Sequence, residues 1–103
     1  MKNTIEINGK EYKAKKILAK DWREIFKFDE GRKDILLIDF VDKHCEIIAN
    51  VLEGVSAEEL QETLSVDEVM TVYNDVLKYL LTLLSAKTSD EKNVVEGVKE
   101  NQL

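Results

Sequence analysis

The sequence predicts an α+β fold, mainly α, in which an N-terminal β-hairpin packs on a small bundle of about four helices. Two short alternating segments flank Asn8-Gly9, a pair that tolerates the positive φ angles of a type I′ turn. Further along, apolar residues recur at helical spacing and proline is absent. With 103 residues, the chain fits one domain. We expect this domain over residues 1–86 and a flexible tail over residues 87–103.

The hairpin is expected over residues 4–14. A two-residue loop sets Ile5 opposite Tyr12 and Ile7 opposite Lys10. Its apolar face then consists of Ile5, Ile7, Tyr12 and Ala14. Because an isolated hairpin is marginal in water, this face must pack on the helices, or the hairpin edge must pair with another chain.

A first helix is expected over about residues 22–30. Asp21, with a glutamate three residues later, has the spacing of a capping box. Gly31 is the predicted end of the helix. Trp22 and Phe26 lie on its apolar stripe, and we expect both to pack in the core beneath the hairpin.

Two long helices are expected over about residues 34–53 and 66–86, with a short helix over 57–63 between them. Ser56 and Ser65, each followed three residues later by glutamate, mark the starts of the last two. The apolar residues of each long helix cover about 200° of its circumference, roughly twice the usual core-facing stripe. Each long helix therefore needs two neighbours, one of them a second copy of the chain or a client.

This apolar surplus predicts self-association or partner binding. The last helix carries two neighbouring apolar seams, of which one can face the core and the other a partner. The candidate binding residues are Leu36, Phe40, Ile47, Val69, Val72, Val76, Tyr79 and Leu83.

Charge and composition exclude several classes of protein. The net charge is -6, and an acidic chain repels phosphates unless its basic groups are concentrated. The N-terminal lysines lack the arginine and aromatic interleaving that base recognition favours, so no nucleic acid partner is expected. A single cysteine and the lack of an apolar N-terminal run argue against secretion and against a membrane span. The expected location is the cytoplasm.

The chain carries little that could support chemistry. No glycine-rich phosphate loop and no spaced Cys/His set are present in the sequence, so no enzyme, no cofactor and no metal site are predicted. His44 and Cys45 are the only adjacent pair with catalytic or ligand potential, and an enzyme built on them is the least favoured alternative. Both lie on the apolar arc of their helix, which favours a structural role in the core or an interface. A His44 buried between subunits would loosen the assembly at mildly acidic pH.

The order of these parts resembles a known family. The resemblance is carried by the hairpin Ile5 to Tyr12, the helix start Lys20-Asp21-Trp22, and the run Gly54 to Leu60 leading into Ser65 to Val69. Over about residues 4–86 the chain resembles the phage tail assembly chaperones, small proteins encoded ahead of the tape measure protein in long-tailed phages and prophages of Gram-positive hosts.

The resemblance implies a mostly helical, non-enzymatic chaperone that forms homo-oligomers. Such a protein binds the long helical tape measure protein in the host cytoplasm before the tail tube polymerises around it, and it is not expected in the mature virion. A small homodimeric regulator or inhibitor from a mobile element, masking a host protein, would use the same apolar surplus and remains the alternative.

Overall fold

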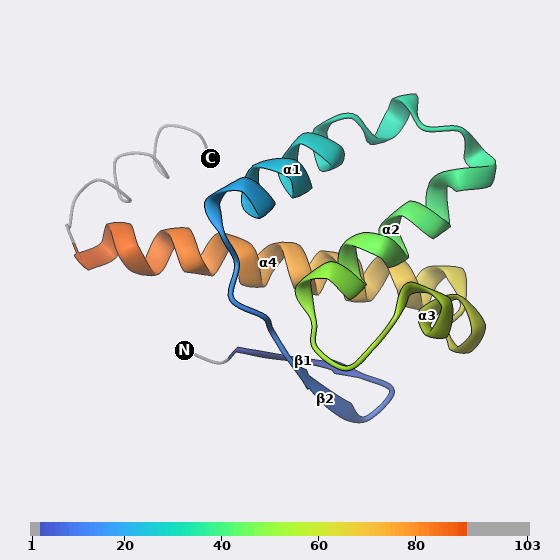
Figure 1. The fold of residues 1–103 in the computed structure, drawn as a ribbon, viewed down its shortest axis with the longest axis horizontal. Helices are drawn as coiled ribbons and strands as arrows, with labels where there is room; N and C mark the ends of the chain where they lie inside the picture. The colour runs from blue at the N-terminus through green and yellow to red at the C-terminus, as the bar shows by residue number, and fades with distance from the viewer. Residues whose placement is uncertain (1–2, 91–103) are drawn as a thin grey trace.

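A computed structural model describes residues 3–90 and arranges the other elements around α4, the longest helix of that region (Figure 1). An antiparallel two-stranded hairpin and four α-helices confirm the expected α+β, mainly α fold. The elements in order are β1 (Thr4–Ile7), β2 (Lys10–Lys13), α1 (Ala19–Glu30), the 3-10 turn η1 (Arg32–Asp34), α2 (Leu37–Val51), α3 (Ala57–Thr63) and α4 (Val66–Asp90).

The hairpin has the predicted register. Ile5 pairs with Tyr12 and Ile7 with Lys10. The turn residues Asn8 and Gly9 have φ angles of 53° and 82°, as a type I′ turn requires. Of the predicted apolar face, Ile5, Ile7 and Ala14 are buried and Tyr12 is partly buried. Strand β1 contacts α4, which covers this face.

The end of β2 and the residues after it pair with the segment that follows α2. The Lys15 N–H donates to the Val51 carbonyl at 2.7 Å, and the Glu53 N–H donates to the Lys13 carbonyl at 2.8 Å. These bonds run along the segment that leaves α2. They end α2 at Val51, two residues before the predicted limit, because the next residues extend to pair with the hairpin.

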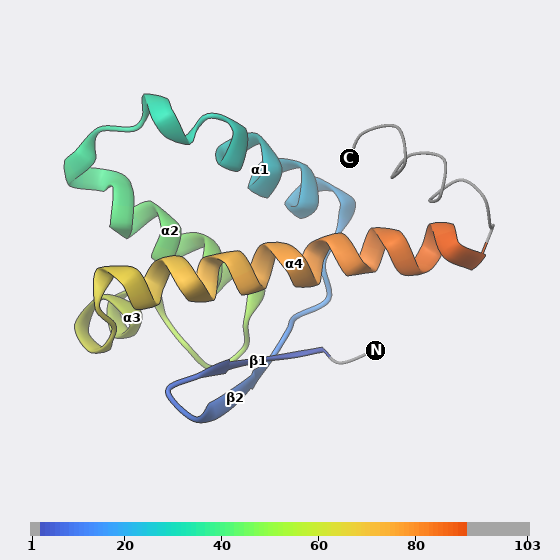
Figure 2. The same cartoon turned by 180° about the vertical axis from the view of Figure 1, so that it is seen from behind.

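Helix α1 begins three residues earlier than predicted and lies on the other side of α4 from the hairpin (Figures 1 and 2). Asp21 is the third helical residue, and its carboxylate accepts a hydrogen bond from the Leu18 N–H at 3.2 Å. The predicted position of Trp22 beneath the hairpin is wrong, because residues 14–18 carry the chain past α4. The Trp22 indole instead donates to the Leu80 carbonyl of α4 at 3.4 Å and packs on Phe26.

Both serine caps of the last two helices are confirmed. The Ser56 hydroxyl accepts from the Glu59 N–H at 3.1 Å. At the start of α4, the Ser65 hydroxyl accepts from the Glu68 N–H at 3.3 Å, and the Glu68 carboxylate accepts from the Ser65 N–H at 2.8 Å. The helix then continues to Asp90, so the predicted tail begins too early for residues 87–90. The rest of that predicted tail lies outside the described residues.

We expect Ser65→Ala to lower the free energy of unfolding by about 1 kcal/mol, the usual cost of losing an N-cap hydroxyl. The same hydroxyl donates to the Asp67 carboxylate and holds the Asp67 pKa below its ordinary value. The substitution should therefore also raise the Asp67 pKa, which carboxyl NMR titration would measure. Urea unfolding of Asn74→Ala, an exposed site in the middle of α4, is the control. Equal stability of Ser65→Ala and the wild type would contradict the cap.

The core lies between α2 and α4 and is closed by α1, α3 and the hairpin (Figure 2). Within residues 3–90, none of the helices combines the length and the apolar character needed to cross a bilayer. The largest fully buried side chains are Tyr73, Ile48, Leu52, Leu60, Leu80, His44, Val51, Val69, Val76 and Cys45.

Candidate functional site

Three of the predicted binding residues, Val69, Val72 and Val76, are buried inside the subunit. They form one inward face of α4 with Tyr73 and Leu80, covered by α2 and the hairpin. The prediction that these valines offer a binding surface is wrong for this structure. This buried face takes residues from both predicted seams, because Tyr73 and Leu80 belong to one and the three valines to the other, so the division into a core seam and a partner seam is also wrong.

Four further predicted residues, Phe40, Ile47, Tyr79 and Leu83, are partly buried. The last three pack against the edge of the core, whereas the Phe40 ring packs on His44, with centroids 4.4 Å apart. Of the eight candidates, Leu36 alone is largely exposed, at 69% of its possible surface.

The most exposed aliphatic residues of the described chain form what we call the aliphatic ridge, Leu36, Leu37 and Ile38. Their exposed fractions are 69%, 89% and 83%. Leu36 precedes α2, and Leu37 and Ile38 are its first two residues. Adjacent residues at a helix start point about 100° apart, so a run of three large aliphatics there cannot be buried on one side. That spacing was the available sequence signal for Leu37 and Ile38, which the prediction omitted.

The ridge lies on an ordered helix start with charged neighbours. The Asp39 N–H donates to the Leu36 carbonyl at 2.9 Å, which closes the first turn. Asp34, Asp42 and Lys43 flank the ridge and are exposed. Burying each of its aliphatic side chains against a partner would contribute about 1.5–3 kcal/mol. An apolar surface with a charged border is typical of protein-binding sites.

A second apolar surface is a groove between the start of α1 and the C-terminal half of α4. Its volume is about 600 Å³. Trp22 lies between the two helices, where its indole contacts α4. The groove and the ridge lie in different parts of the molecule. The groove is lined by the C-terminal half of α4, whereas the start of α2, which carries the ridge, lies toward the N-terminal end of α4 (Figure 1). The residues lining the groove are Ile17, Leu18, Ala19, Trp22, Leu83 and Leu84.

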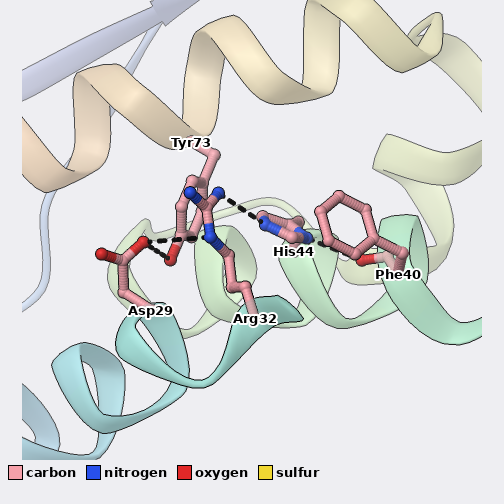
Figure 3. A network of polar contacts seen from close by, with 5 residues as sticks. All are labelled: Asp29, Arg32, Phe40, His44 and Tyr73. Carbon is pink, nitrogen blue, oxygen red and sulfur yellow. Dashed lines mark hydrogen bonds and ion pairs between the residues drawn. The ribbon is translucent and has the colours of Figure 1, made fainter. Parts of the chain in front are cut away.

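A partly buried polar cluster joins α1, η1, α2 and α4 (Figure 3). His44 of α2 is fully buried within the subunit, which confirms a core position. Its Nδ1 lies 2.6 Å from the Phe40 carbonyl oxygen, and its Nε2 lies 3.1 Å from Nη1 of Arg32. The Tyr73 ring packs edge-on against the imidazole, with centroids 4.4 Å apart.

Asp29 completes the cluster from α1. Its Oδ1 accepts a hydrogen bond from the Tyr73 hydroxyl at 2.9 Å and lies 3.3 Å from Nε of Arg32. Burial, and then this bond to a carboxylate, raise the pKa of Tyr73 well above its ordinary value. Arg32 also lies over the Tyr73 ring, 5.3 Å from its centroid. The cluster therefore connects the α1–α2 junction to α4.

The pKa of His44 lies below its ordinary value, chiefly because burial disfavours the charged imidazolium. The Arg32 guanidinium lowers this pKa further. The hydrogen bond to the Phe40 carbonyl and the charge of Asp29 act in the opposite direction without outweighing them. His44 is thus neutral at neutral pH, with one ring nitrogen donating and the other accepting.

Cys45 offers little as a nucleophile in this fold. Its side chain is fully buried. Burial, together with the nearby Asp42 and Glu46 carboxylates, raises the pKa of its thiol, whereas reactive cysteines have a lowered pKa and some exposure. In the part of the chain that the structure describes, no group of three or more His, Cys, Asp or Glu residues could hold a metal ion.

Comparison with known proteins gives no relative for this chain. No protein-family model matches it, and neither the curated proteins nor the solved structures contain a significant match.

Proposed function

We propose that this chain is a non-enzymatic binding protein that shelters an apolar helical partner, as a tail assembly chaperone does for the tape measure protein of a long-tailed phage. The observation that supports this proposal is the aliphatic ridge, with three adjacent large side chains more than two-thirds exposed. Leaving such side chains in water is unfavourable, and a partner that covers them gains that free energy.

Self-association belongs to the same proposal. The ridge and the groove are separate apolar surfaces of the described residues, and a client can cover one while a second copy covers the other. The net charge of -6 would keep such a complex in solution, because like-charged particles repel one another. The host cytoplasm is the proposed location.

We expect the double variant Leu37→Asp, Ile38→Asp to lose client binding by more than tenfold while keeping the wild-type helical signal. The reason is that both side chains are almost fully exposed in the free protein and buried only against a partner. The measurement is co-purification with a co-expressed tape measure protein, together with mass by light scattering and far-UV circular dichroism.

A charge-matched control separates apolar contact from electrostatics. Lys33→Ala with Lys43→Ala changes the net charge by the same two units at exposed sites on either side of the ridge. This control should retain the client. If the ridge variant captures the client as well as the control does, the ridge is not the binding surface.

The alternative, a homodimeric regulator that masks a host protein, is favoured by the small extent of the ridge. Three adjacent residues suit the centre of one closed two-fold interface, where a few residues supply most of the binding energy. A dimer that shows no affinity for a tape measure protein would support this alternative. A neighbouring gene for a very long helical protein would support the chaperone.

A further inference from the structure

We propose that Asp29, Arg32, His44 and Tyr73 form a clasp that holds the aliphatic ridge in its binding position, and that protonation of His44 opens the clasp. Binding at the ridge would then weaken at mildly acidic pH. This inference rests on the function proposed above, because it assigns regulation to the same surface.

The geometry of His44 requires a neutral imidazole. The Phe40 carbonyl can only accept a hydrogen bond, so Nδ1, 2.6 Å from its oxygen, carries the proton. The Arg32 guanidinium can only donate, so Nε2, 3.1 Å from Nη1, must present its lone pair. In the imidazolium both nitrogens carry protons. The Nε2 proton would then face a cation that has no acceptor, and the contact with Arg32 would be lost.

Two charged groups face His44 from other elements, and they act on its protonation in opposite directions. Arg32 of η1 supplies the like charge, and Asp29 of α1 supplies the opposing negative charge. The Asp29 carboxylate is already engaged by the Tyr73 hydroxyl of α4 and by Nε of Arg32. The Phe28 ring of α1 packs against the imidazole at a centroid distance of 5.1 Å and adds no charge. Burial and the Arg32 charge both disfavour the protonated form of His44, and together they outweigh Asp29.

The clasp is connected to the ridge through the backbone of η1. Arg32 is the first residue of this turn, and its carbonyl accepts from the Ile35 N–H at 3.1 Å. The Asp34 N–H donates to the Gly31 carbonyl at 3.0 Å. Leu36 follows Ile35 directly. A turn this short gains little from its own hydrogen bonds, so the anchored Arg32 side chain is what fixes the approach to the ridge.

Hydrogen exchange at the Asp34 and Ile35 amides tests the clasp without any client. In an open clasp His44 titrates near its ordinary pKa of 6.5, whereas in the closed clasp its pKa is lower. Lowering the pH from about 7.5 to about 5.5 should therefore raise the opening constant, by at most about tenfold after correction for intrinsic exchange. Opening should also be far more frequent than at the Leu80 amide in the core, which reports global unfolding.

Two variants and one control assign the effect to His44 and Arg32. His44→Gln keeps an acceptor for Arg32 but does not titrate, so its opening constant should not depend on pH. Should this core variant fail to fold, Arg32→Gln removes the facing cation from a partly exposed site and should reduce the dependence. Lys33→Ala, next to Arg32 and exposed, should keep it. Exchange of Asp34 and Ile35 only by global unfolding, or an unchanged pH dependence in both variants, would overturn the clasp.

A separate binding measurement connects the clasp to the ridge. Using a histidine-free fragment of a tape measure protein, we expect affinity to fall between about pH 7.5 and about 5.5 in proportion to the closed fraction that the exchange measurement gives, because only the closed fraction binds. Binding by His44→Gln should not change. Affinity that stays constant while exchange responds to pH would overturn the regulation. No binding at either pH, with pH-dependent exchange, would instead overturn the proposed function and leave the clasp standing.

Discussion

Val76→Asp is expected to leave this protein unfolded. The Val76 side chain has no exposed surface and lies on the face of α4 that packs against α2. A carboxylate at this position would lose its hydration without gaining a partner, a cost of several kcal/mol. A domain of this size is stable by about 5–15 kcal/mol, so this one change removes much or all of its stability. Far-UV circular dichroism and a thermal melt would measure the loss.

Asn74→Asp is the matched control for this substitution. It introduces the same charge into the same helix at an exposed position and should leave the melting temperature within a few degrees of the wild type. If the Val76→Asp protein folds and melts cooperatively, the surface formed by Val69, Val72 and Val76 is accessible, as the sequence predicted. Charged substitutions in this seam therefore report on folding and give no information on partner binding.

Leu60→Ala is expected to lower the free energy of unfolding by about 2–5 kcal/mol, the usual cost of a cavity left by a buried leucine. Leu60 is the buried residue of α3, a helix of seven residues packed on α2. A helix this short is not stable in isolation, so its position depends on packing against the core, to which Leu60 contributes the one fully buried side chain of α3. Urea unfolding gives the change in free energy, and protease sensitivity near α3 shows whether the helix detaches.

Gln61→Ala serves as the comparison for Leu60→Ala, because Gln61 is the next residue of α3 and is exposed. Its free energy of unfolding should stay within about 0.5 kcal/mol of the wild type. Similar losses in both variants would indicate that α3 is held by something other than the buried leucine.

Features that depend on a few neighbouring residues were predicted well. The turn at Asn8 and Gly9 fixes which residues face each other across the hairpin, and the register followed from it. The caps at Ser56 and Ser65 likewise involve only the residue three positions later, through its backbone N–H at both helices and also through the Glu68 carboxylate at Ser65. The predicted start of the first helix was three residues late, because an acidic side chain can stabilise a helix from its first turn as well as from the residue before it.

Features that depend on distant segments were not predictable in the same way. A wide apolar arc shows that α4 has several neighbours, but only the placement of α2 and the hairpin decides that Val72 is covered and Leu84 is not. The clasp joins Asp29 to Tyr73 and Arg32 to His44, pairs that no local spacing connects. Of the three ridge residues, only Leu36 was predicted, and its two neighbours were not.

The pairing between the hairpin and the end of α2 has a consequence for the order of assembly during translation. The hydrogen bond from the Lys15 N–H to the Val51 carbonyl cannot form until residue 51 has left the ribosome. The apolar face of β1 waits longer still, because α4 is the last described element to be synthesised. The hairpin is thus synthesised first, but its packing partners are synthesised last. Its apolar face stays exposed on the nascent chain until nearly the whole described domain has emerged.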